Sequence, residues 1–218
     1  QMYTLYLLML SLLIEIQKYS ISQVALSTKK YLADSSDEYP SKDKFANNAL
    51  LLQLTSNTLL KDELSKRKLK NWYLNEEYVK LIYKEIVVSE SYKSYMLSST
   101  SSYDEDKKLI QDLFKDVIAP NEKIYDYFED DQLTWVDDIP IVNTFVLKQF
   151  RKAVKNQKPS FFLPNLLKDD EDRDYAQQLL VKTLLNNDKW EKEIEGKTPN
   201  WDKDRIADID SILLKMAI

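Results

Sequence analysis

Apolar residues recur at helical spacing through the first half of the chain. In the opening stretch they fall three or four positions apart, at Leu5, Leu8, Leu12 and Ile16. This spacing predicts one or two helices over residues 2–33, and the same pattern predicts helices over residues 45–69 and 76–97. A run of Ser and Thr at 98–102 is the best candidate for a domain boundary, so residues 1–97 are expected to form an N-terminal helical region.

The apolar opening is expected to be a core helix rather than a membrane span. It is shorter than the roughly 20 apolar residues that cross a bilayer, and Ser11 and Glu15 interrupt it. It also lacks the positively charged lead of a signal peptide. We therefore expect a buried helix and no membrane association.

An apolar stripe occurs twice in the second half of the chain. In its first occurrence, paired apolar residues lie at positions i, i+4 and i+8 of a helix that begins at residue 103 and ends before Pro120. Those pairs are Leu109/Ile110, Leu113/Phe114 and Val117/Ile118. Shifted by 66 residues, the matching pairs are Tyr175/Ala176, Leu179/Leu180 and Thr183/Leu184.

Other signals repeat at the same offset, including Trp135 with Trp201 and, after one inserted residue, residues 142–148 with 209–215. Agreement of several features at one spacing indicates an internal repeat. We interpret residues 103–150 and 170–217 as two copies of a three-helix unit. The domains that follow are 103–168 (the first copy and a linker) and 169–218 (the second copy).

Composition supports an all-α helical bundle. The chain has 218 residues and a single glycine, Gly196, whereas hairpins, bulges and phosphate-binding loops depend on glycine. It has no cysteine and no histidine, which removes thiolate nucleophiles, the commonest general base and the usual zinc ligands. We therefore expect no enzyme activity and no cofactor, and the absence of cysteine fits a cytoplasmic protein.

Charge gives little sign of nucleic-acid binding. The net charge is −5, and the densest basic stretch, residues 61–70, is diluted by two acids. Three acidic clusters, at residues 104–106, 129–131 and 169–172, are interpreted as solvated carboxylates, the first and last at helix starts where the helix dipole favours them.

Four aromatic residues have both a structural and a binding interpretation. Trp135 and Trp201 each precede a helix, where a tryptophan fits either a stacking platform for bases or an anchor onto the core. Phe161 and Phe162 lie in a loop bracketed by two prolines, which fits either a partner-binding patch or a loop packed on the core. We favour burial in each case, because large aromatic side chains are mostly buried.

The C-terminal segment carries a resemblance to a known family. It reads Lys197-Thr-Pro-Asn-Trp201-Asp-Lys-Asp-Arg205-Ile-Ala-Asp-Ile-Asp210-Ser-Ile-Leu-Leu-Lys215-Met-Ala-Ile218. In type and spacing it resembles a hallmark stretch of the NusB family of transcription antitermination factors, and residues 175–194 are also similar. The rest is similar to the longer NusB proteins of Bacteroidetes-type bacteria. The chain departs from the family at Ser211 and Lys215, where arginine is common.

The resemblance implies a fold and a set of partners. The fold is a NusB-like helical bundle that pairs with the small ribosomal protein NusE, and the pair binds boxA RNA in nascent ribosomal RNA. RNA polymerase then reads through terminators together with NusA and NusG. The same resemblance places Asp210 near the NusE surface, with Arg205 and Lys215 as the basic residues beside it. It also implies that this chain is a fragment that lacks both the arginine-rich first helix and the final helices.

Two other functions stay open at this point. One is the NusB-like domain of a ribosomal RNA cytosine methyltransferase, whose catalytic domain would follow residue 218. The other is a helical protein-interaction scaffold unrelated to transcription. The duplicated upstream unit disfavours the methyltransferase domain, and the resemblance in both type and spacing from Trp201 to Ile218 disfavours the scaffold.

Overall fold

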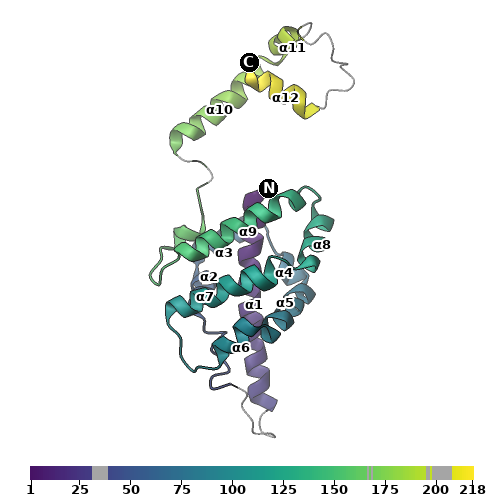
Figure 1. Ribbon diagram of the computed structural model, residues 1–218. Helices are drawn as coiled ribbons and strands as arrows, with labels where there is room; N and C mark the ends of the chain where they lie inside the picture. Colours follow the sequence, from purple (N-terminus) through teal and green to yellow (C-terminus); the bar gives the residue numbers. More distant parts are fainter. Residues whose placement is uncertain (31–38, 166, 168, 195–196, 198–207) are drawn as a thin grey trace. The chain divides into compact units, whose positions relative to one another are not determined.

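The computed structural model describes residues 1–30, 39–165, 167, 169–194, 197 and 208–218. The described residues form helices and contain no strand, so the all-α prediction is confirmed (Figure 1). They divide into two compact units, Gln1–Pro164 and Asn165–Ile218, and each unit is described by itself.

The first unit contains nine α-helices, a π-helical turn and a 3-10 turn among the described residues. The first part of this unit comprises α1 (Met2–Lys30), α2 (Ala49–Ser56), α3 (Thr58–Lys66), α4 (Asn71–Leu74), α5 (Glu76–Val88) and α6 (Glu90–Met96). Its second part comprises α7 (Tyr103–Leu113), η1 (Phe114–Ile118), α8 (Glu122–Asp131), α9 (Trp135–Lys152) and η2 (Pro159–Phe162).

Helix α1 is the core of the first unit. Its four expected apolar positions, Leu5, Leu8, Leu12 and Ile16, are all fully buried. Its neighbours are buried too, and a helix that is apolar on every side is stable only when other helices surround it. The helices α2, α4, α5 and α9 supply that cover (Figure 1). Each fully buried leucine contributes about 1.5–3 kcal/mol relative to exposure.

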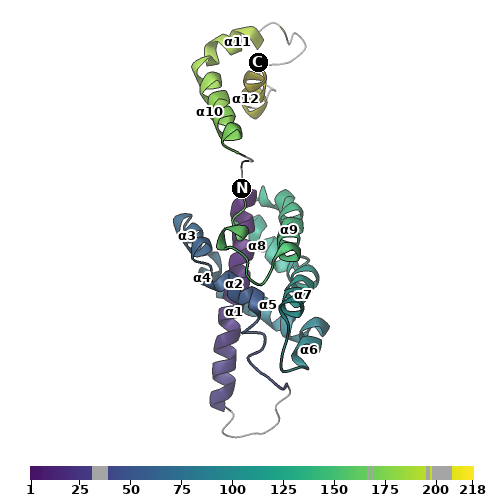
Figure 2. The same ribbon diagram turned by 90° about the vertical axis from the view of Figure 1, so that its left-hand side faces the viewer.

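The same helix meets the length and composition of a membrane span. Residues Met2–Ser27 are apolar enough to cross a bilayer, but 67% of the most apolar window is buried inside the unit. The last turns of α1 project beyond the other helices (Figure 2). The expected burial of Leu5–Ile16 is confirmed within this fold.

Two of the expected helices are each divided in two. The predicted helix over residues 45–69 breaks at Asn57, whose side chain accepts a hydrogen bond from the N–H of Leu60 at 3.0 Å and so caps α3. The predicted helix over residues 76–97 breaks at Ser89, which caps α6 in the same way. Asn and Ser favour such caps because their oxygens satisfy amides that a helix leaves unpaired.

The start of α7 follows the sequence pattern. Ser102 caps the helix, and the Glu105 carboxylate accepts a hydrogen bond from the N–H of Ser102 at 2.6 Å, which completes a capping box. The stripe of Leu109, Leu113 and Ile118 is buried. Helix α9 begins at Trp135, two residues before the acidic start signal, and it contains Pro140 within its N-terminal half.

The expected boundary at 98–102 lies inside the first unit, and Ser98 contacts a segment distant in sequence. The Lys44 ammonium donates to Ser98 Oγ at 2.7 Å, and Ser101 donates to Asp106. Helix α7 also packs against α2 and α6. The structure therefore groups residues 1–97 with 103–164, and the division between units follows Pro164.

The second unit consists of α10 (Asp170–Leu185), α11 (Asn187–Ile194) and α12 (Asp208–Ala217) among the described residues. Helix α12 packs against α10 and α11, as α9 packs against α7 and α8 in the first unit. Within these three described helices no residue is buried.

Candidate functional site

The structure describes two of the three residues expected at a partner surface. Asp210 lies in the first turn of α12 with an exposed side chain, and Lys215 lies in the last turn of the same helix. Arg205 lies outside the described residues. Five positions on an α-helix correspond to a rotation of about 140°. The structure therefore does not bring Asp210 and Lys215 together on one side of α12.

Lys215 holds α12 against α11. Its ammonium donates to Asn187 Oδ1 at 2.9 Å and lies 3.3 Å from Glu191 Oε2. Its side chain is only 14% exposed, whereas that of Glu191 is 66% exposed. An ion pair with one exposed partner stabilises by less than about 1 kcal/mol. Lys215 therefore positions the helix within its own unit, a role that sequence reasoning missed.

Several large apolar side chains lie exposed on α10 and α12 of the second unit. On α10, Leu180 and Leu184 lie one turn apart and are 56% and 67% exposed. On α12, Ile209 and Leu213 are also one turn apart and are 60% and 55% exposed. Scattered exposed leucines are normal on proteins, but rows of them on neighbouring helices are typical of interaction surfaces.

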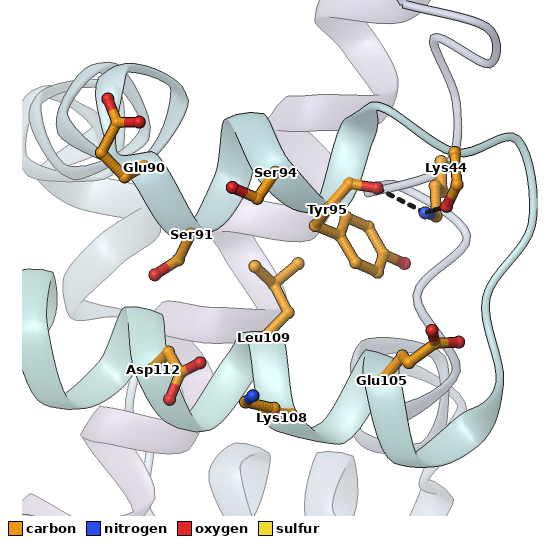
Figure 3. A pocket seen from close by; sticks show the side chains of 10 residues that line it. Lys44, Glu90, Ser91, Ser94, Tyr95, Glu105, Lys108, Leu109 and Asp112 are labelled. Atoms are coloured by element: carbon orange, nitrogen blue, oxygen red, sulfur yellow. Dashed lines mark hydrogen bonds between the residues drawn. The ribbon is translucent and has the colours of Figure 1, made fainter.

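A second candidate place is a hollow of about 450 Å³ in the first unit (Figure 3). Helix α6 supplies Ser94 and Tyr95 to its lining, α7 supplies Glu105 and Asp112, and Lys44 comes from the segment before α2. Figure 3 shows the Lys44 ammonium against the main-chain oxygen of Tyr95, at 2.5 Å. The same ammonium lies 3.9 Å from the centroid of the Tyr95 ring.

This hollow is organised by a satisfied hydrogen-bond network. Asp106 accepts from the hydroxyl of Tyr95 at 2.6 Å and from the N–H of Ala49 at 2.7 Å. Burial, and secondarily the hydrogen bond to Asp106, raises the pKa of Tyr95. Burial also lowers the pKa of Lys44, although nearby carboxylates oppose it. These groups tie α2, α6 and α7 together, and we assign them a structural role.

The acidic clusters at 104–106 and 169–172 lie at the starts of α7 and α10 as expected, but one member of the first is buried. Asp104 and Glu105 lie exposed in the first turn of α7, whereas Asp106 is 5% exposed and caps α2. The hydrogen bonds from Ser102 hold the pKa of Glu105 below its ordinary value. Among the described residues, no group of three or more Asp and Glu is placed to hold a metal ion.

Trp135, Phe161 and Phe162 pack on the core of the first unit. Trp135 is 4% exposed and meets Phe128 edge to face, with ring centroids 5.6 Å apart. Phe162 is buried, and its neighbour Phe161 is partly buried against the core. The predictions that Trp135 and the proline-bracketed loop pack on the core are confirmed, and Trp201 lies outside the described residues.

Comparisons of this chain with known protein families, with curated protein sequences and with solved structures find no match.

Proposed function

We propose that this chain is a non-catalytic binding protein of the NusB type that acts in transcription antitermination. The observation that carries the proposal is the exposed apolar surface on α10 and α12, which shares α12 with the exposed Asp210. Covering exposed rows of leucine and isoleucine with another protein stabilises the complex by about 25 cal/mol for each Å² of apolar area removed from water. The partner that fits the proposal is NusE.

The helix boundaries support the finer proposal of a duplicated three-helix unit. Helix α10 corresponds to residues 104–119 at an offset of 66, and α11 corresponds to 121–128 at the same offset. Helix α12 corresponds to 141–150 at an offset of 67. In this proposal the second copy is the NusB-like part of the chain.

The RNA affinity of the second unit depends on its partner. Residues 165–218 contain thirteen Asp and Glu and nine Lys and Arg, so this unit repels a phosphate backbone overall. Binding of boxA RNA then requires positive charge from NusE or from the first unit. The complex would act on RNA polymerase with NusA and NusG in the bacterial cytoplasm.

Fluorescence anisotropy of labelled boxA RNA tests this function. The 218-residue chain is titrated with and without NusE, and a scrambled RNA of the same length is the control. We expect affinity to rise when NusE is present and to fall for the scrambled RNA. Equal binding of both RNAs with no effect of NusE would overturn the proposal and favour a scaffold, because the same apolar surface also suits an unrelated protein partner.

A further inference from the structure

A hollow of about 550 Å³ lies where α1, α3 and α4 meet. Helix α4 packs against α1, and Trp72 fixes that contact because its indole N–H donates to the carbonyl oxygen of Leu8 at 2.8 Å. Figure 2 shows α3 and α4 beside the N-terminal half of α1. The hollow is therefore built on the core of the first unit, and its volume is in the range that holds a small ligand such as one nucleotide.

The lining of this hollow is positively charged. Lys18, Lys61 and Lys70 line it, and among the described residues Glu15 is its one lining carboxylate. Glu15 is already engaged by Lys18, with 2.6 Å between Nζ and Oε1. Lys61 and Lys70 therefore give the hollow an uncompensated positive charge in a chain whose net charge is −5.

Helix stabilisation does not explain this charge fully. Cations after the C-terminal end of α3 offset its negative dipole, but Lys61 lies near the N-terminal end, where the dipole disfavours a cation. Residues 61–70 contain five basic and two acidic side chains. At the corner after α3, Lys68 has a left-handed backbone with φ of 58°. Glycine adopts that conformation without strain. Lysine at this position accepts some strain but places a cation at the corner.

An aromatic ring completes the lining. Tyr73 follows the buried Trp72 and is 76% exposed, so its ring face is accessible to a flat ligand. The hydroxyls of Ser11 and Ser65 also line the hollow. Proteins hold single-stranded nucleic acid by two kinds of contact: basic side chains bind the phosphates, and exposed aromatic rings stack on the bases.

We propose that this hollow is a binding site for single-stranded RNA, with phosphates on Lys61 and Lys70 and a base stacked on Tyr73. The identity of the RNA rests on the proposed function, but the site itself rests on its charge and shape. It supplies the positive charge that the second unit lacks.

The test measures the affinity of the 218-residue chain for labelled boxA and scrambled RNA at several salt concentrations. The variant Lys61→Gln/Lys70→Gln is expected to bind both RNAs at least about tenfold more weakly at low salt, and the slope of log K against log salt should become shallower by about 1.4, since each phosphate contact contributes about 0.7. Tyr73→Ala is expected to lower affinity about tenfold with an unchanged slope, because stacking carries no charge.

The matched control is Lys80→Gln/Lys123→Gln, which removes the same charge from lysines that are ion-paired with Glu76 and Asp126. It should bind RNA with the affinity of the unsubstituted chain, and circular dichroism should show all variants equally helical. Equal losses in the control and the Lys61/Lys70 variant would overturn the site, as would an unchanged affinity in the latter. If the Lys61/Lys70 variant binds both RNAs equally weakly, and NusE does not raise the affinity of the unsubstituted chain for boxA RNA, the site is supported but the antitermination role is not.

Discussion

Tyr6 donates its hydroxyl proton to the main-chain oxygen of Phe162 at 3.0 Å, and this bond joins the first helix of the first unit to its last turn. Both residues are buried, at 2% exposure each. The ring of Tyr6 also meets that of Phe145 edge to face, at 5.3 Å between centroids. The contact explains why the proline-bracketed loop belongs to the first unit rather than to a linker.

Replacing Tyr6 tests this closure. Tyr6→Phe keeps the ring and removes the hydroxyl, so it should lower the free energy of unfolding by about 1–2 kcal/mol, the usual cost of losing one buried hydrogen bond. Urea unfolding followed by circular dichroism measures the change. Tyr175→Phe, at a residue that is 68% exposed, should change stability by less than about 0.5 kcal/mol. Equal effects of the two substitutions would contradict the account.

Alkaline pH should destabilise the first unit. Burial raises the pKa of Tyr6 and Tyr95, and it raises the pKa of Tyr103 to about 12. In the unfolded chain these groups ionise near pH 10. The unfolded state therefore loses protons first, so the stabilisation is complete below about pH 10 and is lost as pH rises towards the folded pKa values. Urea unfolding between about pH 8 and pH 11.5 should show the fall, and Tyr103→Phe should reduce it.

Asp106 should be the most sensitive acid of its cluster. Asp106→Ala removes the shared acceptor of Ala49, Tyr95 and Ser101 at a part-buried place, so we expect a loss of about 3 kcal/mol. Asp104→Ala is the control, because Asp104 is 86% exposed and pairs with Lys107 at 3.1 Å. It should cost less than about 1 kcal/mol. Thermal unfolding of the two variants compares them directly.

Lys215 should position α12 rather than contact a partner. Lys215→Met removes its bonds to Asn187 and Glu191 and keeps its apolar stem, so we expect faster amide hydrogen exchange in α12. The affinity for NusE should stay within about threefold of that of the unsubstituted chain. A loss of NusE binding without faster exchange would place Lys215 in the interface instead.

The sequence was sufficient to predict helices and caps where the signals were local. The stripe of α7 and its Ser102 cap follow from spacings of three and four residues, and both are present. The breaks at Asn57 and Ser89 were missed, although both are capping residues, because the apolar spacing continues through them. Asn57 also donates to the main-chain oxygen of Pro159 at 2.9 Å, a tertiary contact that no local pattern encodes.

The candidate sites were harder to predict than the helices, because they depend on contacts between residues distant in sequence. The serine run at 98–102 has the composition of a linker, yet Ser98 bonds to Lys44 across 54 positions of the chain. The partners of Lys215 and the cap that Asp106 provides are also distant in sequence. The basic stretch at 61–70 is visible in the sequence, but the hollow that makes it a candidate site requires the packing of α4 on α1.

The most direct test of the antitermination account is a titration of fluorescently labelled NusE with the 218-residue chain. The account predicts saturable binding that Asp210→Lys weakens at least about tenfold, because the substitution reverses a charge at the proposed interface. Asp130→Lys, with the same change in net charge on the first unit, should leave the affinity unchanged. Absence of NusE binding, or equal loss in both variants, would contradict the account.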